Sequence, residues 1–226
     1  MSINIAIDGP SGAGKSTMAK AAAKELGFIY VDTGALYRTI GLFALRSGAA
    51  PAEEAAVTPL LEGLSVELKY SGGEQRVLLN GEDVSETIRT PEASMAASQV
   101  SAHGPVRAFL FDLQRRIAAE NDCVMDGRDI GTVVLPQAQI KIFLTATDED
   151  RARRRYEELL EKDPTVRFED VLADLRERDH NDSTRALAPL KPAEDSIRVD
   201  TTGFPLVKSI KTITSIIREE LKHAGI

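Results

Sequence analysis

The chain begins with an alternating apolar pattern that gives way at once to a helical one. Ile3, Ile5 and Ile7 alternate with polar or small residues, which predicts a strand, and the Ala-rich stretch 18–26 predicts a helix. Residues 28–31 are apolar again and predict a second strand. Strands that lead directly into helices are typical of an α/β fold, in which a parallel sheet is flanked by helices.

The same order of elements continues along most of the chain. Further strands are expected at 123–126, 140–144 and 196–199. Cap residues and apolar periodicity predict helices at 33–46, 91–101, 106–119, 147–161, 168–182 and 206–222. These elements complete the expected α/β core.

One segment departs from this order. Residues 49–63 are rich in Ala, Pro and Glu and predict a linker with a short helix, whereas residues 64–84 alternate with turns at Ser71-Gly72-Gly73 and Asn80-Gly81. This pattern predicts a small three-stranded antiparallel meander, which has no place in a parallel sheet. We therefore expect a core of residues 1–48 and 86–226 that carries an inserted subdomain, residues 49–85.

The connection between the first strand and the first helix is rich in glycine. Its sequence is Gly9-Pro10-Ser11-Gly12-Ala13-Gly14-Lys15-Ser16-Thr17. This is the spacing of a phosphate-binding loop (P-loop), whose backbone amides and helix N-terminus face a polyphosphate. Lys15 is expected to reach the β- and γ-phosphates, and the Ser16 hydroxyl to ligate the Mg²⁺ that travels with the nucleotide.

Two later strands also end in residues with candidate chemistry. Asp32 or Thr33 can cap the following helix, whose N-terminus is a second potential anion site, and Arg38 lies about one turn into it. An ordinary capped helix with a solvated arginine is the alternative. Asp126 closes an apolar strand, the position at which P-loop proteins orient magnesium-bound water.

The predicted helix from residue 147 is unusually basic. Its arginines are Arg151, Arg153, Arg154 and Arg155. Such a run is either a solvated face matched to acidic neighbours or, in a phosphotransferase, a mobile lid over the nucleotide, here near 148–165.

Composition narrows the classes of partner. The chain has 226 residues, is 42% hydrophobic and 28% charged, and contains no apolar run near the roughly 20 residues that cross a bilayer. Its net charge of −7 argues against extended nucleic-acid or anionic membrane surfaces, so a phosphate substrate needs a local cluster of cations. We expect a cytoplasmic protein, because the start of the chain lacks the basic region of a signal peptide. We also expect a monomer, because the sequence indicates no exposed apolar surface that requires a partner.

The cysteine and histidines offer little chemistry. The single Cys123 excludes an intrachain disulfide and is expected to be a buried structural thiol. His103, His180 and His223 lack metal-ligand spacing and are predicted to lie on the surface.

Three motifs beyond the P-loop resemble those of the bacterial cytidylate kinases. They are Asp32-Thr33-Gly34-Ala35-Leu36-Tyr37-Arg38, Asp126-Gly127-Arg128-Asp129-Ile130-Gly131-Thr132 and the segment from Arg178 to Arg185. The resemblance covers nearly the whole chain and includes the meander. It implies transfer of the γ-phosphoryl group of Mg-ATP to CMP or dCMP, within a P-loop core that has an NMP-binding insert and an arginine-rich lid.

The resemblance also implies roles for individual residues. Residues 9–17 with Arg154 and Arg155 would bind ATP, and the catalytic group would be Lys15, Asp126, Arg128 and Arg185. The CMP phosphate would be held by Arg38, Arg128 and Arg185. Cytosine would be read by Ser98, Arg107 and Asp129, and the sugar would lie near Arg178 and Asp182. Thr33 stands where some relatives have serine, which keeps a hydroxyl for the substrate.

Three other functions are compatible with the P-loop itself. A P-loop kinase for UMP, AMP or shikimate would differ only in its acceptor pocket. A GTP-binding switch is disfavoured because the chain has no Asn-Lys-x-Asp stretch to read guanine. A structural protein that keeps a P-loop could use the closing amphipathic helix, 206–222, at an interface, although packing on its own sheet is commoner.

Overall fold

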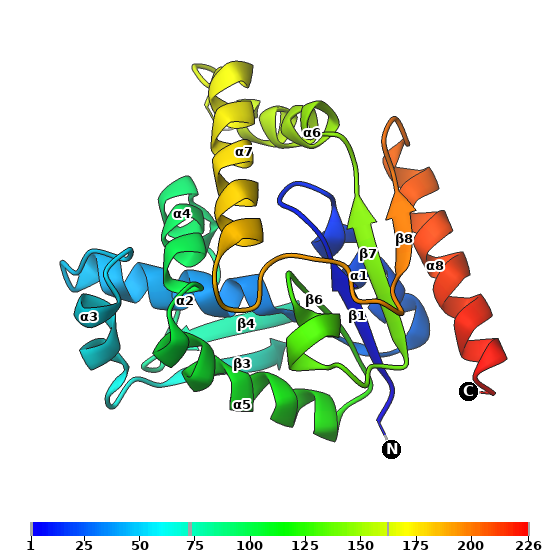
Figure 1. Cartoon of the computed structure of the whole chain (residues 1–226), viewed down its shortest axis with the longest axis horizontal. Coiled ribbons are helices and arrows are strands. Elements are labelled where there is room, and N and C mark those ends of the chain that lie inside the picture. Colours follow the sequence, from blue (N-terminus) through cyan, green and yellow to red (C-terminus); the bar gives the residue numbers. More distant parts are fainter. Residues whose placement is uncertain (1, 72–73, 162, 226) are drawn as a thin grey trace.

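Five parallel strands form the centre of the protein, in the order β2-β6-β1-β7-β8 (Figure 1). The computed structural model describes residues 2–71, 74–161 and 163–225. The strands are β1 (Asn4–Asp8), β2 (Ile29–Asp32), β6 (Cys123–Gly127), β7 (Ile140–Thr145) and β8 (Ile197–Asp200). Their register pairs Asp8 with Gly127 and Asp32 with Asp126. The predicted α/β class is confirmed, and its candidate residues meet where the strands end.

The alternation in β1 sends side chains to both faces of this sheet. Ile5 and Ile7 pack in an apolar cluster with α1 (Lys15–Leu26) and α8 (Leu206–His223). Ala6 lies in a second cluster, to which α5 (Gly104–Glu120) contributes Ala118. The sheet is therefore covered by helices on both faces, and the closing helix packs on its own sheet.

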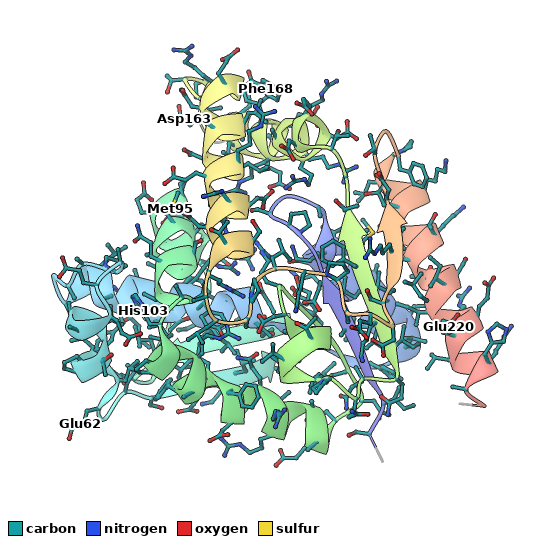
Figure 2. The ribbon with its side chains drawn as sticks, viewed as in Figure 1. Glu62, Met95, His103, Asp163, Phe168 and Glu220 are labelled. Carbon is teal, nitrogen blue, oxygen red and sulfur yellow. The ribbon has the colours of Figure 1, made fainter. Side chains whose placement is uncertain are left out.

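The remaining helices are α2 (Thr33–Arg46), α3 (Glu54–Val57), α4 (Pro91–Val100), α6 (Asp148–Leu160) and α7 (Phe168–Thr184), with 3₁₀ turns at Thr58–Leu61 and Thr87–Arg89 and a π-helical turn at Ile130–Val134. Of these helices, α6 and α7 lie beyond the carboxyl ends of the strands, whereas α3 lies at the far end of α2 (Figure 1). The predicted caps are confirmed, since Asp32 accepts from the Ala35 amide at 2.9 Å and Thr90 from the Ala93 amide at 3.1 Å. Figure 1 shows α6 and α7 above the strand ends, and Asp163 and Phe168 lie at the outer end of this pair (Figure 2).

The meander is a separate antiparallel sheet of β3 (Val66–Ser71), β4 (Glu74–Leu79) and β5 (Glu82–Asp83). Its second turn has the predicted left-handed residues, with φ of 49° at Asn80 and 85° at Gly81. The first predicted turn, at Ser71-Gly72-Gly73, lies partly outside the described residues. Apolar side chains of β3 and β4 pack with α2 and α5 in one cluster, which attaches this sheet to the core.

Three local expectations have clear outcomes. Helix α1 begins at Lys15 rather than 18, because Gly14 in the left-handed region, at φ 89°, lets the helix start within the loop. The Cys123 thiol is fully buried, as predicted, and burial raises its pKa to about 12. The surface prediction was wrong for His103, which is only 7% exposed and has its Nε2 atom 2.8 Å from the Pro51 carbonyl (Figure 2).

None of the helices in the described residues has the length and apolar character needed to span a membrane.

Candidate functional site

The P-loop lies between β1 and α1, and its glycines are required by its backbone. Gly9, Gly12 and Gly14 have φ of 152°, 71° and 89°, which side-chain-bearing residues rarely adopt. A Cβ atom at Gly9 would lie 2.0 Å from the Leu144 carbonyl oxygen. The loop can take this path only with glycine at these positions, which agrees with the bend predicted from its spacing.

Lys15 is buried at the base of the loop, with 6% of its surface exposed. Its Nζ donates to the Pro10 carbonyl at 2.7 Å. Burial, with the nearby positive charge of Arg128, lowers the pKa of Lys15 to about 7. The charges of Asp126, Asp179 and Asp182 act in the opposite direction, and a bound phosphate would add to them and favour the charged form of Lys15.

Asp126 is linked directly to the P-loop. One carboxylate oxygen accepts from the Ser16 hydroxyl and the other from the Tyr30 hydroxyl, each at 2.9 Å. Burial and the charge of Asp32 raise the pKa of Asp126 to about 6. The serine hydroxyl and this carboxylate supply the hard oxygen donors that Mg²⁺ prefers, so the pair fits the predicted magnesium site.

These groups open into a cleft of about 1530 Å³. It is bounded by the P-loop, the start of α2, α4, α6, α7 and the start of α8. The predicted residues that line it are Ser11, Gly12, Gly14, Lys15, Ser16, Thr17, Thr33, Arg38, Ser98, Asp126, Arg128, Asp129, Arg154, Arg155, Arg178, Asp182 and Arg185. Nearly all of the candidate residues therefore meet in one cavity, although they come from distant parts of the chain.

The other predicted residues support this wall. Gly9, Pro10 and Ala13 are buried. Arg107 is 9% exposed and forms an ion pair with Asp129, which faces the cleft. Thr33 is also buried, and its hydroxyl donates to the Asp126 carbonyl at 2.7 Å.

The arginines of the cleft are held by carboxylates. Arg38 pairs with Asp32 at 2.8 Å. Arg128 donates through Nε to Asp182 at 2.8 Å, and the second oxygen of Asp182 accepts from the Ser98 hydroxyl at 3.1 Å. Each guanidinium is thereby fixed in direction while some of its five N–H donors stay available.

A second network surrounds Asp129. Arg107 pairs with one of its oxygens, and Arg185 donates to the other at 3.3 Å and to the Ser101 hydroxyl at 2.9 Å. Arg178 has a buried Nε without a hydrogen-bond partner among the described residues, as do Arg38 at Nε and Arg107 at Nη1. Burial and Arg128 lower the pKa of Arg178 to about 10, so it stays charged at neutral pH and favours an anionic ligand.

The predicted lid arginines lie in different surroundings. Arg154 donates to the Thr201 carbonyl at 2.8 Å and to the Ala13 carbonyl of the P-loop at 3.4 Å. Arg155 pairs with Glu158 at 2.9 Å on the cleft side of α6. Arg151 is buried and contacts the P-loop residue Ser11, a role that its place in an arginine run did not indicate.

Sequence reasoning missed several partners in this site. Tyr30 was assigned only to a strand, Asp32 only to a helix cap and Ser101 only to a helix end. Their hydrogen bonds to Asp126, Arg38 and Arg185 join residues through the fold. Of these contacts, the pair of Asp32 and Arg38 had a local signal in the sequence. The two residues are six positions apart and lie within two turns of one helix, so their side chains can meet.

Known proteins share both the sequence and the fold of this chain. The family described as Cytidylate kinase matches residues 5–219. The cytidylate kinase of Caldicellulosiruptor bescii is 45% identical over 98% of both chains, and that of Pelotomaculum thermopropionicum is 50% identical over 94% of both. A crystal structure of an uncharacterized protein from Eubacterium ventriosum has a TM-score of 0.51 at 13% identity, covering 99% of each chain, which is a likeness of fold.

The family matches nearly the full length of the chain, and the two relatives cover it almost completely. Both findings agree with the cleft, in which a P-loop faces a cluster of arginines. The chain therefore belongs to the cytidylate kinase family of nucleoside monophosphate kinases.

Proposed function

We propose that this protein transfers the γ-phosphoryl group of ATP to CMP and dCMP, forming CDP and dCDP. The observation that carries the proposal is the single cleft in which the P-loop faces Arg38, Arg128 and Arg185. A P-loop and a separate set of phosphate-binding arginines in one cavity suit an enzyme with two phosphate-bearing substrates. A GTP-binding switch would have no need for a second set of phosphate-binding arginines.

On the donor side, residues 9–17 bind the ATP phosphates through backbone amides, and Lys15 neutralises the β- and γ-phosphate oxygens. Arg154 and Arg155 extend this site from α6, the lid near 148–165. The Ser16 hydroxyl and, through water, the Asp126 carboxylate would hold the nucleotide's Mg²⁺. When bound, Mg²⁺ neutralises charge on the phosphate oxygens and favours the carboxylate form of Asp126.

On the acceptor side, Arg38, Arg128 and Arg185 hold the CMP phosphate. Two like unit charges about 4 Å apart repel by about 4 kcal/mol at an effective dielectric constant near 20, so cations must offset the approach of the two phosphates. The planar guanidinium matches phosphate oxygens two at a time. The acceptor oxygen is already ionised, so no general base is needed, and catalysis consists of positioning, charge neutralisation and exclusion of water.

Cytosine specificity is assigned to Asp129, with Ser98 and Arg107. A carboxylate at Asp129, which is already paired with Arg107 and Arg185, can accept a further hydrogen bond from the exocyclic amine of cytosine, whereas the carbonyl of uracil has no hydrogen to donate and would face the carboxylate oxygens. Arg178 and Asp182 lie near the sugar in this proposal. The hydroxyl of Thr33 donates its hydrogen to the Asp126 carbonyl, so in this proposal it can only accept a hydrogen bond from the substrate.

The proposal extends to the organisation of the enzyme. Residues 49–85 are the NMP-binding insert of a core made from 1–48 and 86–226. We infer a monomer, because one chain supplies every wall of the cleft, and light scattering tests this against the mass of 24.5 kDa. We place the enzyme in the cytoplasm, where its substrates are made.

The test is a coupled ADP-release assay with Mg-ATP and a panel of CMP, dCMP, UMP, AMP, GMP and shikimate, with a control that lacks acceptor. Turnover largely confined to CMP and dCMP is the expected result. Activity on another acceptor would overturn the cytosine assignments but keep the kinase mechanism. Hydrolysis that is indifferent to every acceptor would favour a nucleotide switch.

A further inference from the structure

Asp179 joins the helix that carries acceptor residues to the P-loop. It lies on α7 between Arg178 and Asp182. Its Oδ1 accepts from the Ser11 amide of the P-loop at 3.0 Å, and its Oδ2 forms an ion pair with Arg151 of α6. Both oxygens are thus used within the protein, and Asp179 is not among the described residues that line the cleft.

Arg151 completes a three-way junction between the P-loop, α6 and α7. It donates to the Ser11 carbonyl at 2.7 Å and to the Ala146 carbonyl at 2.9 Å, and it also pairs with Asp148. Its side chain is only 4% exposed, so the pairing with Asp179 is made in a poorly solvated place. The backbone of Ser11 is therefore held at two points, its N–H by Asp179 and its carbonyl by Arg151.

This junction is closely packed. A Cβ atom at Gly12 would lie 3.1 Å from the Arg151 carbonyl oxygen and 3.2 Å from the Leu175 Cδ1 atom. The start of α6 and the middle of α7 therefore rest directly on the loop. One turn further along α7, Asp182 fixes Arg128 and Ser98 on the acceptor side.

We propose that Asp179 is a positioning residue, which sets α7 relative to the P-loop and so aligns the acceptor phosphate with the γ-phosphate of the donor. The inference rests on the proposed function. In-line transfer needs the reacting atoms about 3 to 3.5 Å apart, and a displacement of about 1 Å costs on the order of 100-fold in rate. A short link between the two substrate sites controls that distance without touching either substrate.

The first variant is Asp179→Asn. The amide oxygen still accepts from Ser11, but the charge that faces Arg151 is lost, while Arg151 keeps Asp148. We expect kcat with CMP to fall at least about tenfold, because alignment is realised in the transition state, while KM for ATP and CMP changes less than about threefold. The rate of ATP hydrolysis without acceptor should change little, so the ratio of transfer to hydrolysis should fall.

The matched control is Glu177→Gln, which removes the same charge from an exposed position on the same helix. We expect it to retain the wild-type ratio of transfer to hydrolysis. A second variant, Asp179→Glu, keeps the charge beside Arg151 but lengthens the link by one methylene group. We expect it to fold and to lose kcat in the same way, with thermal unfolding of each variant reporting the folded fraction.

The inference is overturned if both Asp179 variants are folded and keep kcat within about twofold of the wild type. It is also overturned if neither variant folds, because Asp179 would then be a folding residue, or if KM alone rises. These failures are distinct from failure of the proposed function, in which the wild-type protein itself would not phosphorylate CMP.

Discussion

Replacement of Asp129 by asparagine tests the acceptor pocket through both stability and specificity. In the wild type, one carboxylate serves two buried arginines, Arg107 and Arg185, whose side chains are 10% and 5% exposed. Asp129→Asn keeps the size of the side chain but removes the charge. Two guanidinium groups then share one buried region without their common counter-ion.

The size of the effect follows from this burial. Loss of one partner of a buried ion pair costs about 3 to 5 kcal/mol, because the remaining charge stays desolvated and uncompensated. In a protein of this length, about 2 to 4 °C of Tm is lost per kcal/mol, which predicts a Tm lower by about 6 to 20 °C. The serine partner of Arg185 softens the loss, so the lower half of this range is expected.

Specificity should change in the same variant. The asparagine amide can turn either its oxygen or its NH₂ group toward the base, so the carbonyl of uracil gains a donor where it met a carboxylate. We expect the ratio of kcat/KM for CMP over UMP to narrow. Because the neutral amide no longer discriminates by charge, the change should come mainly from a smaller penalty on UMP.

Scanning calorimetry and steady-state kinetics with both nucleotides provide the two readouts. Asp112→Asn, an exposed carboxylate on the helix that carries Arg107, is the control and should stay within about 0.5 kcal/mol of the wild type. An unchanged CMP-to-UMP ratio would refute the role of Asp129 in reading the base. An unchanged Tm would refute the energetic account of the arginine network.

Three further outcomes follow from the donor side and the helix packing. Burial lowers the pKa of Lys15 to about 7, and a bound polyphosphate favours the charged form of the lysine. Binding of Mg-ATP at a pH about one unit above that pKa should therefore take up close to one proton, and binding at a pH about one unit below it should take up far less. Calorimetry in buffers of different ionisation enthalpy measures this proton uptake. Ser16→Ala removes the hydroxyl that contacts Asp126 and should weaken apparent Mg²⁺ affinity on the order of tenfold or more, measured as rate against Mg²⁺ concentration. Gly41→Ala would place a Cβ 2.8 Å from that of Ala96, so it should destabilise the protein by about 1 to 3 kcal/mol in denaturant unfolding and, by moving α4, raise KM for CMP.

The regular elements were predictable because their signals are local. A cap at Asp32, a cap at Thr90 and the Asn80-Gly81 turn each act on the few residues beside them, and the structure has them where the patterns placed them. The observed ends of helices differ from the predicted ends by a few residues where the backbone conformation of a single residue decides the boundary. At Gly14, left-handed geometry lets the helix begin inside the P-loop.

The pairing of charges could not be predicted in this way. Arg185 meets Asp129 across 56 residues and Ser101 across 84, contacts that only the assembled helices create. The burial of His103 has the same cause, because the segment around Pro51 folds over it. Resemblance to a family named the arginines proposed to bind substrate and also Asp129 and Asp182, but the pairing of these carboxylates with the arginines became visible only in three dimensions.

These pairings explain how a chain with a net charge of −7 can bind two polyanionic nucleotides. Arg128 and Arg185 are each fixed by a carboxylate, Asp182 and Asp129, so their rotamer freedom is lost on folding rather than on binding. Each pairing engages only part of a guanidinium that has five N–H donors, so an incoming phosphate can be accepted without breaking the pair. The acidic partners also suppress repulsion among the arginines while the cleft is empty of anions. Nucleotide binding then depends on how the carboxylates orient the arginine side chains, and the negative net charge of the protein has little influence on it.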